Sequence, residues 1–239
     1  MRLMEDVLII KNIEREGPGY FKDLLKKFGV SYKIIEFGNG EEPPNHRDYK
    51  AVIVLGGPDS ANDETKKTIE ELYFIKNIIE DKVPYLGICL GMQLLVKATE
   101  GKVVKAHEKE IGFKVNENVN YSVEIKDDCL DDPIFVDVDK SFNVFQLHGE
   151  TVEPKNNIKI LGVGNIVKNQ AVKFGENAYG FQFHVEFDKE LIERCASEDN
   201  DLKKLSKDKL FIEYGEIEIN YKKLCEVILR NFLKIAKII

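Results

Sequence analysis

The segment VPYLGICLGMQLLVKA, residues 83–98, is the clearest indication of the fold in this sequence. Its first part, residues 83–88, is almost wholly apolar and predicts a buried strand. A helical segment follows at once, from Leu90 to about Thr99, with Cys89 at the junction. A buried strand that passes directly into a helix is typical of a parallel sheet covered by helices on both faces.

The sequence before this segment repeats the same alternation. Apolar runs at residues 6–10, 31–36 and 51–55 predict three further strands. Apolar residues at helical spacing after Gly19 and over residues 63–80 predict the helices that alternate with them. We therefore expect an α/β fold with a largely parallel central sheet flanked by helices.

The sequence changes character between Gly101 and about Phe183. Short strand-like pieces follow one another there with turns between them, which predicts antiparallel additions to the sheet. These pieces are residues 102–106, 113–119, 121–125, 142–147, 158–164, 170–174 and 179–186.

The last part of the sequence, residues 186–239, predicts a charged, helical C-terminal extension. Apolar side chains recur at helical spacing over residues 216–239, so we expect an amphipathic helix packed on the body of the protein. They are Ile219, Leu224, Val227, Ile228, Phe232 and Ile235. Because no internal repeat or low-complexity linker is present, residues 1–239 are predicted to form a single domain.

Composition restricts the class of protein. Of the 239 residues, 43% are hydrophobic and 32% are charged, which is typical of a globular chain with a substantial core. The net charge of −7 disfavours general nucleic-acid binding. The apolar run near the N-terminus is too short for a signal peptide, and no apolar stretch is long enough to span a bilayer. We expect a cytoplasmic protein without a membrane partner.

The four cysteines, Cys89, Cys129, Cys195 and Cys225, form no CxxC pair or Cys/His ligand cluster. A disulfide framework and a structural metal site are therefore not expected. Cys89 differs from the others because glycines flank it in Gly87-Ile88-Cys89-Leu90-Gly91, where a strand meets a helix.

This pattern is that of a nucleophile elbow with cysteine as the nucleophile. A sharp turn pushes the side chain into the open, and the helix N-terminus favours a thiolate. The N–H of Leu90 could donate a hydrogen bond to an oxyanion. The alternative is a buried structural cysteine in an ordinary strand-to-helix turn, which is how we interpret the other three.

A cysteine nucleophile requires a base and a group that orients the base. His184 stands near the end of the apolar piece YGFQFHVE, and in a strand it would share one face with Gln182 and Glu186. A carboxylate two residues away can accept the imidazole N–H and fix the tautomer. The alternative is a surface His and Glu that alternate by chance on an edge strand.

GICLGMQ at residues 87–93, followed by FQFHVE at residues 181–186, resembles the class I (triad) glutamine amidotransferases, which have a GxCxGxQ elbow and a late HxE pair. The resemblance implies a flavodoxin-like fold and a Cys89-His184-Glu186 triad. It also implies hydrolysis of the side-chain amide of glutamine without a cofactor. The GGP loop and the overall length resemble the stand-alone amidotransferase domains of GMP synthetase most closely.

The resemblance also implies further site residues. Gly57, with Gly56 beside it, matches the loop that supplies the other half of the oxyanion hole, and Gln93 matches a residue that holds the substrate glutamine. Leu147, His148 and Gly149 match a stretch that binds the α-amino and carboxylate groups, partly through its backbone. Residues 110–112 resemble an element that we interpret as structural. Many members have proline where Val185 stands, and no synthetase domain is recognisable here.

Three hypotheses of function remain open. The first is a glutamine amidotransferase that passes ammonia to a separate synthetase subunit or other acceptor, which the sequence does not name. The second is a hydrolase of γ-glutamyl peptides or conjugates that uses the same thioester chemistry without a partner. The third, which the intact triad disfavours, is a catalytically silent binding protein.

Overall fold

A computed structural model describes residues 5–239, so the first four residues of the N-terminal segment considered above lie outside it. Nine strands form the central sheet in the order β2-β1-β3-β4-β13-β12-β11-β8-β9. The parallel strands are β2 (Tyr32–Glu36), β1 (Val7–Lys11), β3 (Ala51–Val54), β4 (Tyr85–Ile88) and β13 (Ala178–Phe181). The antiparallel strands are β12 (Asn169–Phe174), β11 (Ile158–Gly164), β8 (Ser122–Ile125) and β9 (Ser141–Asn143).

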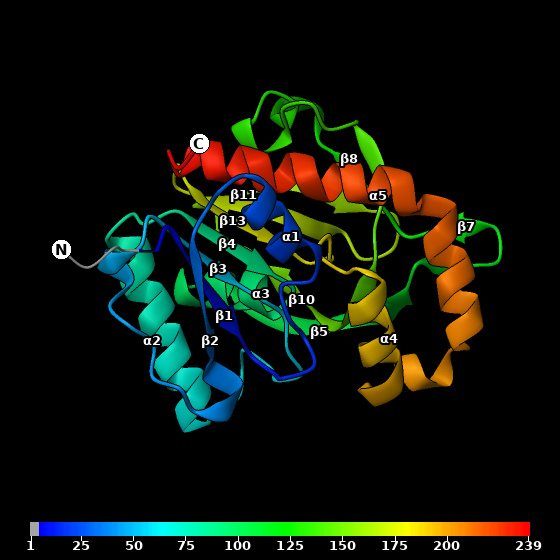
Figure 1. Ribbon diagram of the computed structural model, residues 1–239, viewed down its shortest axis with the longest axis horizontal. Coiled ribbons are helices and arrows are strands. Elements are labelled where there is room, and N and C mark those ends of the chain that lie inside the picture. Colours follow the sequence, from blue (N-terminus) through cyan, green and yellow to red (C-terminus); the bar gives the residue numbers. More distant parts are fainter. Residues whose placement is uncertain (1–4) are drawn as a thin grey trace.

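Helices cover both faces of this sheet, as predicted (Figure 1). They are α1 (Tyr20–Lys27), α2 (Lys66–Glu80), α3 (Leu90–Ala98), α4 (Lys189–Glu198) and α5 (Lys207–Ile235). Alternate residues of the strands point to opposite faces, so β1 buries Val7 and Ile9 in the core beneath α1 and α5. Its residues Leu8 and Ile10 enter the second core, beneath α2 and α3.

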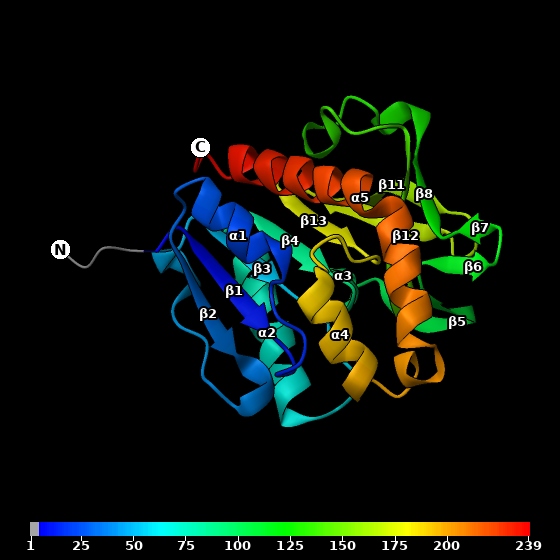
Figure 2. The ribbon, with the colours of Figure 1, turned by 45° about the vertical axis from the view of Figure 1, so that its right-hand side comes forward.

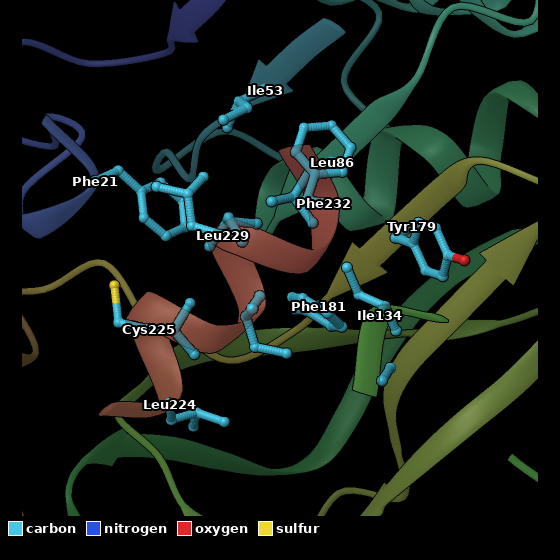
Figure 3. Close-up of a cluster of buried hydrophobic side chains, with 14 of the residues drawn as sticks. Phe21, Ile53, Leu86, Ile134, Tyr179, Phe181, Leu224, Cys225, Leu229 and Phe232 are labelled. Carbon is cyan, nitrogen blue, oxygen red and sulfur yellow. The ribbon is translucent and has the colours of Figure 1, made fainter. Parts of the chain in front are cut away.

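The core beneath α5 is drawn in Figure 3, where the helix passes among side chains from several other elements. Phe21 of α1, Ile53 of β3 and Phe181 of β13 surround Leu229 and Phe232 of α5 (Figure 3). All five are almost inaccessible to solvent. The C-terminal helix is therefore part of the main hydrophobic core.

Several strand predictions were wrong in their pairing. Residues 102–106 belong to β5 (Lys102–Gly112), which pairs with β10 (Gln146–Glu153) as a separate antiparallel ribbon. The predicted piece 113–119 forms a hairpin of β6 (Lys114–Asn116) and β7 (Val119–Asn120). The piece 142–147 is divided between β9 and β10. Alternation of apolar residues predicts a strand but does not reveal which strand lies beside it.

The C-terminal extension also differs from the prediction for residues 216–239. α5 begins at Lys207, and in both views α4 lies beside its first half (Figures 1 and 2). Ile219, expected on the packed side, is 85% exposed. Ile217 and Tyr221 are buried instead, because a turn of 3.6 residues places them on one face of α5 and Ile219 on the other. Within residues 5–239, no helix is long and apolar enough to cross a membrane.

Candidate active site

Cys89 is the single residue between β4 and α3, and its backbone is in an unusual conformation. Its φ of 51° and ψ of −104° lie outside the regions that side-chain-bearing residues ordinarily adopt. The Cys89 N–H donates to the carbonyl of Phe181 at 2.7 Å, and its carbonyl accepts from the N–H of Gln93 at 3.1 Å. Cys89 is thus held in strain between the sheet and α3, as at a nucleophile elbow.

The two glycines that flank Cys89 are required by close packing of the backbone. A Cβ atom on Gly87 would collide with the backbone of Gly91 and would lie 2.7 Å from the nitrogen of Met92. A Cβ atom on Gly91 would collide with the carbonyl oxygen of Val54 in β3. The sharp turn at Cys89 therefore depends on the absence of side chains on both sides of it.

His184 and Glu186 form a buried pair. The Nδ1 atom of His184 lies 2.7 Å from Oε1 of Glu186, and the exposed fraction of each side chain is at most 2%. The other carboxylate oxygen of Glu186 accepts the N–H of Val185 at 3.0 Å. With Nδ1–H donated to Glu186, the tautomer leaves Nε2 free to act on another group.

The predicted continuous strand over residues 179–186 was wrong, because β13 ends at Phe181. His184 lies beyond the strand, where its N–H donates to the carbonyl of Phe145 at 2.9 Å. Its carbonyl accepts a hydrogen bond from the hydroxyl of Tyr221 in α5 at 3.0 Å. An aromatic cluster, Phe145 and Phe187, packs against the ring. His184 and Glu186 therefore lie in a loop, and α5 contacts this loop through Tyr221.

Burial and nearby negative charge have opposite effects on the pKa of His184. Burial by itself lowers the pKa of His184, but the Glu186 carboxylate and the neighbouring Cys89 outweigh it and raise the pKa well above its ordinary value. The Nε2 atom is buried and has no hydrogen-bond partner. Such an atom at a buried histidine indicates a position where a reacting group is accommodated.

The loop after β3 lies against both the histidine and the cysteine. A Cβ atom on Gly56 would lie 3.0 Å from Cε1 of His184 and 3.5 Å from Cβ of Cys89. Gly57 packs on the side chain of Leu90 and lines the same pocket as Cys89. As the first residue of α3, Leu90 has an N–H that no carbonyl within the helix can accept. The structure thus brings both predicted oxyanion-hole residues to the nucleophile.

Gln93 is buried one turn along α3 and lines the pocket. Its side-chain amide donates to the carbonyl of Glu150 and to the side chain of Gln182, at 3.3 Å each. Gln182 in turn donates to the sulfur of Cys89 at 3.6 Å. Gln182 was expected on the face of His184, but its contact with the sulfur was not predicted.

The stretch at Leu147, His148 and Gly149 also lines the pocket. The thiol of Cys89 donates to the carbonyl of Leu147 at 3.7 Å. The imidazole of His148 is turned inward, with Nε2 2.7 Å from Glu110 and Nδ1 2.9 Å from the carbonyl of Glu150. Its side chain is thereby committed to the β5–β10 ribbon, so the imidazole is not free to contact a ligand.

The pocket has a cavity volume of about 440 Å³. Its lining includes residues that were not predicted from the sequence. They come from the loop after β1 and from the end of α4. Arg15 joins these two segments, because its Nη2 atom lies 3.0 Å from Asp199. Glu16 and Asp201 also line this wall. No sequence motif marks these residues, since they meet the pocket only through tertiary packing.

The family profile for "Glutamine amidotransferase class-I" matches residues 21–194 of this chain. The chain belongs to the class-I glutamine amidotransferase family. One of its relatives, a subunit of the glutamine-hydrolysing GMP synthase of Methanococcus vannielii, is 35% identical over 166 residues, which are 68% of this chain and 78% of that protein. The prediction of the family from GICLGMQ and FQFHVE is confirmed.

Two further relatives of this amidotransferase chain show its place in the family. A solved glutamine amidotransferase from Thermotoga maritima aligns with a TM-score of 0.85 and 26% identity, over 97% of this chain and 99% of that one. The glutamine amidotransferase-like protein YfeJ of Salmonella typhimurium is 27% identical over 156 residues, 63% of this chain. The chain spans 62% of the length of YfeJ.

Proposed function

We propose that this amidotransferase chain hydrolyses the side-chain amide of glutamine through a thioester on Cys89 and releases ammonia. One observation carries the proposal. Cys89 is held at a strained turn beside the buried His184–Glu186 pair, whose free Nε2 atom has no other partner. A nucleophile, a base and an orienting carboxylate are the parts that covalent amide hydrolysis requires.

In the first half of the reaction, the sulfur of Cys89 attacks the side-chain carbonyl carbon of glutamine. His184 takes the thiol proton and passes it to the departing nitrogen, so ammonia leaves as the C–N bond breaks. Glu186 stabilises the imidazolium that forms between these two transfers. The N–H groups of Gly57 and Leu90 donate to the oxygen of the tetrahedral intermediate.

In the second half, water replaces ammonia beside His184. The imidazole removes a proton from this water, which attacks the thioester carbonyl and regenerates the thiol with release of glutamate. Gln93 and the backbone at Leu147, His148 and Gly149 hold the glutamyl group. The ammonia passes to an acceptor. The name of the Methanococcus vannielii relative, one subunit of a GMP synthase, supports transfer to a separate synthetase subunit.

Selective alkylation tests this proposal. A glutamine analogue with an electrophilic diazoketone should label Cys89 and leave Cys129, Cys195 and Cys225 unmodified, since all three lie outside the pocket. Peptide mass mapping of the labelled chain identifies the modified residue. Glutamine should protect Cys89 in competition, and labelling that glutamine does not slow would contradict the proposal.

A Glu186→Gln variant should lose about 10³- to 10⁴-fold in kcat with glutamine, because the amide no longer holds the imidazole in the required tautomer. Removing the carboxylate also lowers the pKa of His184, since burial then acts without the opposing negative charge. The acidic limb of the pH profile of kcat/KM, which reports formation of the neutral imidazole that takes the thiol proton, should therefore move to lower pH. A loss of rate without that shift would contradict the assigned role of Glu186.

A partner-independent γ-glutamyl hydrolase is the second candidate, and the size of the pocket favours it. The cavity of about 440 Å³ lies in the range that accommodates drug-sized ligands, which are larger than glutamine. Comparing kcat/KM for glutamine and for γ-glutamyl peptides with the purified chain separates the two. Faster turnover of peptides favours the hydrolase, whereas glutaminase activity that rises with a synthetase partner favours ammonia transfer.

A further inference from the structure

A carboxylate that does not belong to the triad lines the pocket beside Cys89. Glu16 lies in the loop between β1 and α1, is 5% exposed and borders the same cavity as Cys89. Neither half of the proposed glutaminase reaction uses it. A buried acidic side chain at a reaction centre is costly to maintain unless something compensates it.

The carboxylate of Glu16 has little compensation within residues 5–239. Its side chain accepts no hydrogen bond there, and its ion-pair contact is with Arg15, whose Nη2 atom is 3.8 Å from Oε1. Arg15 is itself engaged by Asp199 at 3.0 Å. The second oxygen, Oε2, is therefore available to a molecule in the pocket.

The position of Oε2 relates it to the imidazole. A Cβ atom placed on Gly56 would lie 2.8 Å from Oε2 of Glu16 and 3.0 Å from Cε1 of His184, so these two atoms face the same point. Cε1 is bonded to Nε2, the nitrogen that exchanges the proton. A group that receives this proton must stand close to Nε2, so Oε2 lies in the same neighbourhood as the leaving nitrogen.

The loop that carries Glu16 is tied to the triad. Glu16 donates its N–H to the carbonyl of Ile13 at 3.3 Å, and Tyr20 donates its N–H to the carbonyl of Glu186 at 2.8 Å. Gly19 packs so closely on that carbonyl that no side chain could fit. The position of Glu16 relative to His184 is therefore fixed by the backbone.

We propose that Glu16 is a further catalytic residue, whose Oε2 accepts a hydrogen bond from an N–H of the scissile carboxamide. This inference rests on the proposed function. The hydrogen bond directs the lone pair of the nitrogen towards His184 Nε2. As the S–C bond forms and the C–N bond breaks, the proton from His184 goes to the nitrogen and ammonia departs. Glu16 exchanges no proton in this step.

The electrostatics agree with this geometry. Burial raises the pKa of the Glu16 carboxyl, although the charges of His184 and Arg15 oppose that change. A substrate N–H would donate a hydrogen bond to Oε2. The interaction would strengthen as the nitrogen acquires its proton, and an interaction that strengthens in the transition state accelerates the reaction.

Comparison of an amide with an ester tests the proposal. Glutamate γ-methyl ester has the same acyl group as glutamine, but its leaving oxygen carries no hydrogen. In Glu16→Ala, kcat/KM for glutamine should fall about 10- to 100-fold, the effect of losing a hydrogen bond to a charged group. Glu16→Gln keeps a neutral oxygen that can accept, so its kcat/KM should fall by less than that of Glu16→Ala. The value for the ester should stay within about twofold of wild type, because only the leaving group differs.

The ratio of amide to ester turnover is independent of how much of a variant folds, since both substrates meet the same active molecules. An equal fall in kcat/KM for both substrates would show that Glu16 only supports the structure. No fall for either substrate would show that Glu16 has no role in the reaction. Each result overturns the proposal. Glu213→Gln is the matched control, because Glu213 in α5 is also 5% exposed but lies outside the pocket lining. Its ratio should equal that of wild type. A wild-type chain that hydrolyses neither substrate would instead refute the proposed function itself.

Discussion

A Cys89→Ala variant should lose at least about 10⁵-fold in kcat for glutamine, because no thioester can form without the sulfur. Its stability should change little. Cys89 is 6% exposed and strained at φ 51°, and alanine removes only the sulfur atom from a pocket wall. Ammonia release, followed by an enzyme-coupled assay, and thermal unfolding of the same sample measure both effects.

Cys129→Ala provides the control for this result. Cys129 is also buried, at 2% exposed, but its thiol contacts Asp128 and the carbonyl of Ile160, away from the pocket. We expect wild-type glutaminase activity and a free energy of unfolding lower by about 1 kcal/mol. Retained activity in Cys89→Ala would refute the thioester mechanism. Lost activity in Cys129→Ala would contradict the interpretation of Cys129 as a structural cysteine.

A Gly91→Ala variant should be destabilised by about 3 kcal/mol or more, because the added methyl group has no room between α3 and β3. The new Cβ would overlap the carbonyl oxygen of Val54 and lie 3.2 Å from Cβ of the same residue. For a chain of this length, that loss corresponds to a fall of about 6–12 °C in Tm. Calorimetry or circular dichroism measures it directly.

Gly215→Ala is the control for Gly91→Ala, because it makes the same substitution at a helical position where a methyl group fits. Gly215 is exposed in α5, and no atom lies within 4 Å of the Cβ position. Alanine there should raise the free energy of unfolding by about 0.5–1 kcal/mol, since it favours the helix more than glycine does. Equal Tm values for the two variants would contradict the steric explanation for Gly91.

Much of the fold could be predicted because the parallel strands are almost continuously apolar and each is joined to a helix. The pattern failed where pairing depends on contacts distant in sequence. The sequence of β5 predicts a strand added to the central sheet, yet β5 pairs with β10 in a separate ribbon, as in Leu147 opposite Ile111. Pairing partners are chosen by the packing of whole faces, which alternation in one segment does not contain.

The catalytic candidates were predictable for a local reason. The two glycines around Cys89 mark the turn in the sequence itself, and His184 and Glu186 are only two residues apart. Glu16 carries no such mark, because its position matters only after the β1–α1 loop packs on Gly56. His148 is a different case: the resemblance implies that its stretch contacts the ligand partly through the backbone, and the structure shows that Glu110, distant in the sequence, binds the imidazole.

The hydrogen bond from Tyr221 to the carbonyl of His184 has a consequence for biosynthesis. Tyr221 follows His184 by 37 residues, so the ribosome completes Cys89, His184 and Glu186 before it makes the side chain that steadies the base. A nascent chain halted after Glu186 would contain every catalytic candidate of the triad and lack α5. We expect such a chain to remain inert, so that glutamine is not consumed before α5 has been made.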